Sequence, residues 1–232
     1  DLINKELQKP TITILHQSDF QVLNDIKYSF YFKNALKKAL KNSTLKGTRN
    51  AFLYKKLNAD FILPSYIEEK YVLENKKKKF EKKLKIITLS KLIKRKNIDL
   101  IIKALKNARF DFQFDIYGEG KEKKNLEKLI EKYDLKNKIK IYPYVEHTKI
   151  YDLLDNYDVF ALISEIETFG LSYLEALARG LITIGTKNTG IDGVIENNFN
   201  GFLINPKKEE LEKKLNDIFN LSQEEKELLS KN

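Results

Sequence analysis

The feature that most constrains the fold is a regular alternation, from residue 84 onward, of short apolar runs with longer amphipathic segments. The runs expected to form strands are Leu84–Leu89, Phe112–Tyr117, Lys138–Tyr142, Asp158–Ile163, Leu181–Gly185 and Phe202–Ile204, and the patterns expected to form helices cover 98–107, 121–134, 147–156, 170–179, 191–197 and 207–219. Strands separated by such helices form βαβ units, whose right-handed crossovers give a parallel sheet covered on both faces. We therefore predict one doubly wound α/β domain over 84–219, with ligands beyond the carboxyl ends of its strands.

The residues before this domain predict a second α/β domain over 1–75. The elements expected there are a strand at Thr11–Leu15 that ends at His16, a helical pattern over 28–41 and a short strand at Asp60–Leu63. The lysine-rich stretch 76–83 predicts a basic linker, because it has almost nothing to bury. Residues 220–232 predict a C-terminal helix. The chain has no Met, even at position 1, so we expect that it does not begin at the start of a natural reading frame.

Composition excludes several classes of protein. With 42% hydrophobic and 33% charged residues, the chain is too apolar for a disordered polyelectrolyte and too polar for a multi-span membrane protein. The absence of Cys excludes disulfides, thiolate–zinc sites and cysteine catalysis. His16 and His147 are the only histidines, which disfavours a His-rich metal centre. No apolar run approaches 18 residues and no leader pattern is visible, so we expect a cytoplasmic protein.

The 43 Lys and Arg against 33 Asp and Glu give a net charge of +10. Only four of the basic residues are Arg, whereas readout of nucleic-acid bases favours Arg. We therefore interpret the excess as background charge first, as attraction to an anionic membrane second and as nucleic-acid binding third.

The most informative stretch is S-E-I-E-T-F-G-L-S-Y-L-E-A-L-A-R-G at 164–180, where a strand ends and a helix begins near Gly170. We expect Leu171, Leu174 and Ala178 on the inner face of that helix. The helix-start amides, which suit a phosphate group, are those of Thr168, Phe169, Gly170 and Leu171. Glu167 and Glu175 supply carboxylates that can accept sugar hydroxyls, so the stretch describes a nucleotide-sugar site. A solvated Glu pair on an ordinary helix is the alternative when spacing alone is considered.

The wider sequence favours the nucleotide-sugar interpretation. E-T-F-G-L-S-Y-L-E at 167–175 resembles the E-x7-E signature of retaining glycosyltransferases of the GT-B class, in particular the large family four. Four further segments resemble that family's motifs in order: I-I-T-L-S-K-L-I-K-R-K-N at 86–97, Y-G-E-G-K at 117–121, Y-D-V-F-A-L-I-S at 157–164 and T-G-I-D-G-V-I-E-N-N-F-N-G-F-L-I at 189–204. The resemblance implies a GT-B fold, with 84–219 as the Rossmann-like, donor-binding domain and 1–75 as an incomplete acceptor-side domain. It also implies that both ends of the chain are cut, before the first domain's strands and after the C-terminal helix.

The resemblance also implies roles for individual residues. Glu175 would accept the ribose hydroxyls, and Glu167 would bind hydroxyls of the donor sugar. Lys91 and Lys96 would face the diphosphate and neutralise the negative charge that grows as the sugar–phosphate bond breaks.

Other implied roles lie at the ends of strands. Gly118 would let the backbone approach the nucleotide closely, and Tyr144 and Val145 would be neighbours of the base. His16 would meet the donor sugar from the amino-terminal domain; the alternative for a lone His after a strand is a satisfied core or surface group. We expect His147, at a helix start, to be a solvated surface residue.

The chain departs from the family pattern at three residues and in the connector between Ser65 and Leu84, where the family's N-G-x-D turn is missing. Lys91 stands where the family has Arg, Asn97 where it has Gly and Gly193 where it has the Glu of its G-G-x-x-E element. No D-x-D triplet occurs, so we expect no metal cofactor, with lysines and helix-start amides acting on the diphosphate instead.

The expected function is transfer of a sugar, with retention, from a UDP- or GDP-sugar to a glycan or lipid-linked acceptor in bacterial surface polysaccharide synthesis. Because the acceptor half is mostly absent, we expect the chain to bind a donor but to transfer it poorly. The helical pattern over 28–41 combines an aromatic–aliphatic stripe with lysines, which leaves docking on the inner membrane face open. An inactive nucleotide-sugar-binding domain and a basic nucleic-acid-binding module remain as alternatives.

Overall fold

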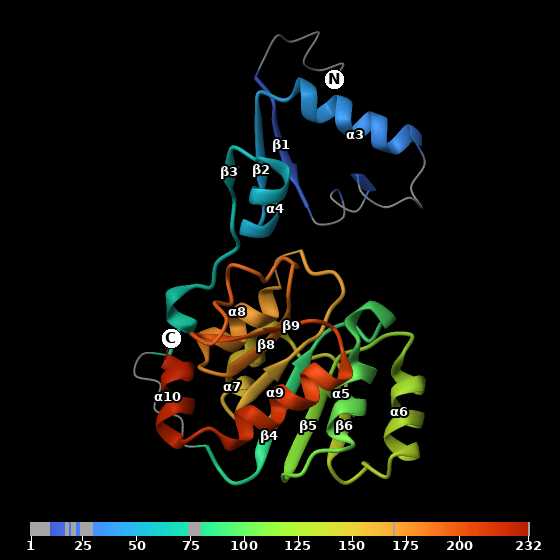
Figure 1. Cartoon of the computed structure of the whole chain (residues 1–232), viewed down its shortest axis with the longest axis vertical. Helices are drawn as coiled ribbons and strands as arrows, with labels where there is room; N and C mark the ends of the chain where they lie inside the picture. The colour runs from blue at the N-terminus through green and yellow to red at the C-terminus, as the bar shows by residue number, and fades with distance from the viewer. Residues whose placement is uncertain are drawn as a thin grey trace. The chain divides into compact units, whose positions relative to one another are not determined.

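The computed structural model describes residues 10–16, 19, 22–23, 30–73, 80–168 and 170–231. Contacts divide the chain into two compact units, and Figure 1 labels most of their helices and strands. The first unit comprises 1–65, 166–169 and 188–194, and the second comprises 66–165, 170–187 and 195–232. Residues 66–73 therefore pack with the second unit, whereas the sequence analysis placed them in the first domain. Residues 76–79 of the expected linker lie outside the described residues.

The first unit contains a parallel sheet in the order β1-β2-β3. Its elements are β1 (Ile12–Leu15), α3 (Phe30–Asn42), β2 (Leu45–Thr48), α4 (Ala51–Leu57) and β3 (Phe61–Ile62). The strand before His16, the helix within 28–41 and the strand within 60–63 are confirmed. Strand β2 was not predicted, because L-K-G-T has no apolar run and contains residues that strands disfavour. Its extended conformation depends on parallel pairing with β1 and β3.

The second unit contains a six-stranded parallel sheet in the order β6-β5-β4-β7-β8-β9. Its strands are β4 (Leu84–Leu89), β5 (Phe112–Tyr117), β6 (Ile139–Tyr142), β7 (Val159–Ala161), β8 (Ile182–Thr186) and β9 (Gly201–Ile204). Its helices are η1 (Glu69–Tyr71), η2 (Lys94–Lys96), α5 (Ile98–Leu105), α6 (Lys123–Lys132), α7 (His147–Leu154), α8 (Leu171–Ala178), α9 (Lys208–Asn220) and α10 (Gln223–Lys231). The predicted doubly wound, Rossmann-like α/β domain is confirmed.

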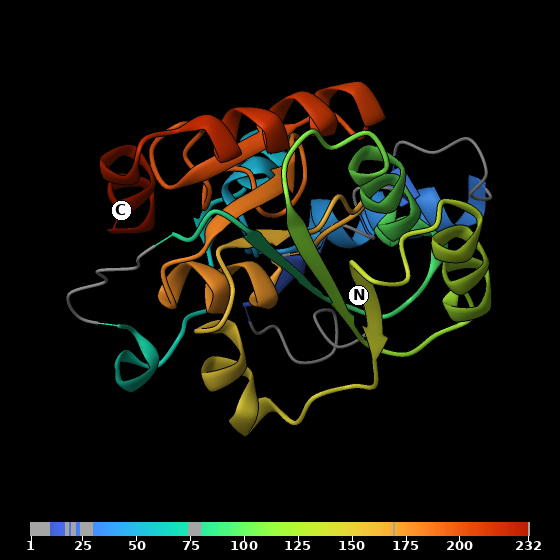
Figure 2. The same ribbon diagram turned by 90° about the horizontal axis from the view of Figure 1, so that it is seen from below.

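Helices cover both faces of this sheet. Figure 2 shows α5 and α9 over one face, with α7 and α8 over the other. The strands are apolar along most of their length, as a sheet buried on both faces requires. The chain order reverses between β4 and β7, so the carboxyl ends of β4 and β7 border the crevice in which ligands of such sheets bind.

The predicted helix over 191–197 is wrong. Successive turns replace it, with the amide of Asp192 bonded to the carbonyl of Thr189 at 3.0 Å and that of Val194 bonded to Ile191 at 3.0 Å. Gly193 has φ +96°, which ends any helical path at that position. Ile191 and Ile195 are nevertheless buried, so their helix-like spacing reflects burial of a turn.

A buried carboxylate interrupts the apolar interior of the second unit. Asp115, in the middle of β5, is 2% exposed. Its Oδ2 accepts hydrogen bonds from the Tyr157 hydroxyl at 2.6 Å and from Gln113 Nε2 at 2.7 Å. Burial, followed by the hydrogen bond to Asp115, raises the pKa of the Tyr157 phenol well above its usual range.

We expect Tyr157→Phe to lower the free energy of unfolding by about 1.5–3 kcal/mol, because a buried carboxylate loses a donor while its burial persists. Urea unfolding followed by circular dichroism measures this change. Tyr144→Phe is the control, because Tyr144 is 68% exposed. Equal midpoints for Tyr157→Phe and the unaltered chain would contradict the assignment of Tyr157 as the stabilising donor.

No helix among the residues that the structure describes is long and apolar enough to cross a bilayer.

Candidate functional site

A cavity of about 630 Å³ opens at the carboxyl ends of β4, β5 and β6. Its lining residues are Leu89, Ser90, Lys91, Tyr117, Gly118, Glu119, Gly120, Tyr144, Val145, His147, Ile150, Ser172 and Glu175. This volume lies within the range of sites for small molecules and cofactors. A second cleft, of about 390 Å³, lies between the end of α5 and α9 and holds none of the predicted site residues.

Five predicted site residues meet at this cavity. Lys91, Gly118, Tyr144, Val145 and Glu175 come from four separate segments of the sequence and all line it. The parallel sheet brings them together, because the segments that carry the first four follow neighbouring strands at the same edge.

One wall of the cavity is a tight backbone turn after β5. Gly118 has φ +150° and Gly120 has φ +153°. The amide of Gly118 donates a hydrogen bond to the carbonyl of Tyr142 at 3.1 Å, and the amide of Leu92 donates one to the carbonyl of Glu119 at 2.8 Å. A Cβ atom on Gly118 would lie 1.9 Å from the carbonyl oxygen of Ser90, so only glycine fits there.

Glu175 is the buried charge of the site. It lies on α8, is 5% exposed and has its Oε1 3.1 Å from Nε2 of His147, which begins α7. Burial raises the pKa of Glu175, and the neighbouring His147 opposes part of this change. We expected His147 to be only a solvated surface residue. Its side chain is indeed 60% exposed, but it contacts Glu175 and lines the cavity.

An aromatic stack lies behind His147. The rings of His147 and Tyr151 meet edge to face, with centroids 5.8 Å apart and an interplanar angle of 89°. Tyr151 in turn stacks on Tyr71, with centroids 3.9 Å apart and an angle of 6°. Burial raises the pKa of the Tyr151 phenol, and the negative charge of Glu175 adds to this change.

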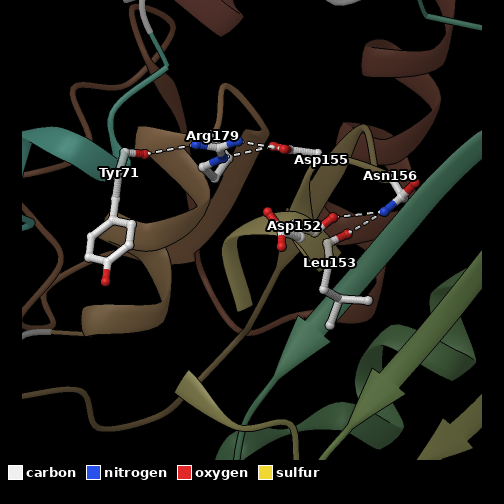
Figure 3. Close-up of polar contacts among 6 residues, drawn as sticks. All are labelled: Tyr71, Asp152, Leu153, Asp155, Asn156 and Arg179. Atoms are coloured by element: carbon white, nitrogen blue, oxygen red, sulfur yellow. Dashed lines mark hydrogen bonds and ion pairs between the residues drawn. The ribbon is translucent and has the colours of Figure 1, made fainter. Parts of the chain in front are cut away.

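The segment that carries Tyr71 is held by Arg179, at the C-terminal end of α8. Its Nη1 donates to the Tyr71 carbonyl at 3.1 Å, while its Nε and Nη2 form a two-point ion pair with Asp155. Figure 3 shows Arg179 between Tyr71 and Asp155. The amide of Leu73 adds a bond to the carbonyl of Ala178 at 3.0 Å.

The predicted phosphate loop is divided between the units. Glu167 and Thr168 belong to the first unit, where the Gly190 amide donates to the Glu167 carbonyl at 2.7 Å and Asn50 Nδ2 donates to the Thr168 carbonyl at 2.7 Å. Phe169 lies outside the described residues. Gly170 adopts φ +72° immediately before α8.

Leu171 is not on the inner face of α8 as predicted. It is 50% exposed, whereas Tyr173 and Ala176 are fully buried. The hydroxyl of Tyr173 donates to the carbonyl of Leu162, the residue after β7, so Tyr173 and not Leu171 is on the inner face of the helix. Ser172 consequently lines the cavity instead of Leu171.

Two other predicted site residues are not among those that line the cavity. Lys96 ends the short helix η2, and His16 follows β1 in the first unit. His16 is exposed, and its amide donates to Oδ2 of Asp19 at 2.8 Å. No cluster of three or more His, Cys, Asp or Glu side chains that could hold a metal occurs within the described ranges.

Comparison of the sequence with known proteins gives a match to a family model and a match to a curated protein. The family model described as glycosyl transferases group 1 matches residues 70–232. The GtfA subunit of the UDP-N-acetylglucosamine–peptide N-acetylglucosaminyltransferase of Streptococcus agalactiae is 32% identical over 136 residues, which are 57% of this chain and 26% of that protein. The chain thus spans about a quarter of the length of this curated relative.

Solved structures share the fold. HepE of Anabaena in complex with UDP has a TM-score of 0.82 at 18% identity, covering 99% of this chain and 67% of that chain. Sucrose-phosphate synthase of Thermosynechococcus elongatus has a TM-score of 0.79 at 15% identity, covering 99% and 64%.

Proposed function

The chain belongs to the group 1 glycosyl transferases, and from this premise we propose that its second unit binds the nucleoside diphosphate of a sugar donor. The observation that carries the proposal is one cavity that joins a lysine, a glycine turn and a buried carboxylate. HepE, which shares the fold, is described in complex with UDP and with UDP-glucose. We therefore favour a UDP-sugar over a GDP-sugar as the donor.

Each part of the cavity has a distinct role in this proposal. Glu175 accepts the two ribose hydroxyls, because an ionised carboxylate forms charge-assisted hydrogen bonds with them. Lys91 faces the diphosphate, and the turn at Gly118 lets the backbone come close to the nucleotide. Tyr144, which is 68% exposed, and Val145 border the base.

Sugar transfer forms the second part of the proposal. The bond between the anomeric carbon and the phosphate oxygen breaks, and the acceptor oxygen bonds to that carbon on the same face, with its proton passing to the leaving phosphate. Lys91 and Lys96 stabilise the charge on the diphosphate, together with the helix-start amides between Thr168 and Leu171. Glu167 and His16 bind the donor sugar, and no step requires a metal.

Calorimetric titration with UDP, GDP and uridine tests the binding step. We expect UDP to bind, and Lys91→Ala to weaken it by roughly 1–2 kcal/mol while leaving uridine unchanged, because only UDP carries the diphosphate. Lys94→Ala is the matched control, since this exposed lysine lies three residues away and does not line the cavity. Absence of binding to every nucleotide, together with salt-sensitive retention on DNA, would favour the nucleic-acid-binding alternative.

The acceptor in this proposal is a glycan or lipid-linked molecule of a bacterial surface, reached at an anionic membrane. The first turn of α3 exposes Phe30, Tyr31 and Phe32 by 80%, 77% and 62%, and lysines follow along the helix. Co-sedimentation should rise severalfold from neutral to anionic vesicles and fall with salt, since each lysine near such a surface contributes about 1 kcal/mol. Equal binding to both vesicle types would remove the membrane from the proposal.

A further inference from the structure

Glu175 has the burial of a core residue and the charge of a binding residue. A carboxylate with two oxygens on a rotatable side chain can bind a pair of ribose hydroxyls well only if its orientation is fixed beforehand. Among its described contacts, the short one is with His147 Nε2, at 3.1 Å from Oε1. That contact occupies one carboxylate oxygen and sets the direction of the group.

His147 itself needs support, because 60% of its side chain is exposed and it stands at the first residue of α7. Tyr151 provides this support from the same helix face, four residues later. Its ring meets the imidazole edge to face in the same orientation of His147 that contacts Glu175. Tyr151 is 5% exposed and so cannot move aside freely.

One face of the Tyr151 ring is covered by Tyr71 in a nearly parallel stack. Tyr71 comes from η1, far from α7 in the sequence, and its backbone is held by Arg179 and through Leu73. Arg179 and Glu175 both belong to the α8 segment, at its C-terminal end and within it. The aromatic stack therefore closes a ring of contacts that begins and ends on α8.

We infer that His147 is a positioning residue for the ribose-binding carboxylate of Glu175, and that Tyr71 holds His147 in place through Tyr151. The inference rests on the proposed function of the cavity. It adds the residues that orient the Glu175 carboxylate toward the ribose hydroxyls. In this arrangement His147 strengthens the binding of ligands that carry ribose hydroxyls and leaves the affinity for ligands without them unchanged. It acts through Glu175 and not on the base or the diphosphate.

The decisive experiment compares UDP with 2′,3′-dideoxy-UDP by calorimetry on the full chain. We expect His147→Ala to lower the affinity for UDP roughly tenfold, the size of one hydrogen bond to a charged group. The affinity for the dideoxy analogue should stay unchanged. His147→Gln should restore most of the affinity, because its amide can donate to the same carboxylate oxygen. In a Glu175→Gln background, His147→Ala should cause no further loss.

A second set of variants tests the aromatic support. Tyr71→Ala should weaken UDP roughly threefold to tenfold without affecting the dideoxy analogue, whereas Tyr71→Phe, which keeps the stacking ring, should bind as the unaltered chain does. Tyr66→Ala is the matched control, because Tyr66 lies in the same segment and is 81% exposed. Thermal unfolding of each variant verifies that it is folded.

The outcomes separate the two proposals. If the unaltered chain binds neither UDP nor GDP, the proposed function fails. If it binds UDP, and His147→Ala either binds UDP equally well or loses both ligands alike, the positioning role fails while the proposed function stands. If His147→Ala behaves as expected but Tyr71→Ala binds UDP with the same affinity as Tyr66→Ala, the role of the stack is overturned.

Discussion

Replacing Gly118 by alanine is expected to lower the free energy of unfolding by at least about 3 kcal/mol, the cost of a strained backbone conformation added to a direct clash. A Cβ at this position would lie 1.9 Å from the Ser90 carbonyl oxygen and 3.0 Å from its carbon. Both atoms are backbone atoms of the loop after β4, so no side chain can rotate to relieve the overlap. Moving that loop would also break the bond from the Ser90 amide to the Tyr117 carbonyl.

Urea unfolding measures this loss, with Glu119→Ala as the control. Glu119 lies in the same turn and is exposed, so its replacement should change the free energy of unfolding by less than about 0.5 kcal/mol. A Gly118→Ala chain that unfolds at the same urea concentration as the Glu119→Ala chain would show that the turn adapts. In that case the close approach of the two loops would not be essential to the cavity.

The sheet of the second unit was predictable because its strands are buried on both faces. Leu84–Leu89 and Phe112–Tyr117 have the predicted bounds, since a continuous apolar run in a parallel sheet has a strong sequence signal. The first unit was harder to predict. Strand β2 owes its conformation to partners on both sides, and that information lies outside its own four residues.

The turn at 191–197 shows the opposite error. Ile191, Val194 and Ile195 have the spacing of one helix face, and the two isoleucines are buried. Spacing reports which side chains are buried but not the backbone path that buries them. Gly193 was the available sign against a helix, because glycine is the residue that tolerates a positive φ.

The sequence predicted the part of the site that the order and direction of the strands determine. The rule that ligands bind at carboxyl ends of parallel strands, together with the family resemblance, identified Lys91, Gly118 and Glu175 as neighbours. The same reasoning missed His147, because its contact with Glu175 depends on the relative rotation of α7 and α8. That rotation follows from packing, and no spacing along the chain encodes it.

Glu175→Gln is expected to separate binding from stability. In the presence of UDP, the variant should bind roughly 1–3 kcal/mol more weakly, because the charged acceptor of the ribose hydroxyls is lost. Without ligand it should be more stable than the unaltered chain at neutral pH, because the folded state no longer buries an ionised carboxylate. Active sites commonly show this opposition between binding and stability.

The pH dependence of the stability difference gives the sharper test. Burial raises the pKa of Glu175 in the folded chain above its usual 4.5. The folded state therefore binds a proton more readily than the unfolded state, so the ionised carboxylate destabilises the fold fully only above the raised pKa. The advantage of Glu175→Gln should thus be largest at neutral pH, shrink as the pH falls through the raised pKa and vanish below about 4.5.

Thermal unfolding of both chains from pH 4 to pH 8 measures this difference, with Glu165→Gln as the control. Glu165 is exposed and lies ten residues earlier in the same unit, so its replacement should shift the midpoint little at any pH. A stability gain from Glu175→Gln that stays constant with pH would mean that the side chain, and not its charge, is poorly accommodated. A loss of stability at neutral pH would mean that the contact with His147 outweighs the burial of the charge.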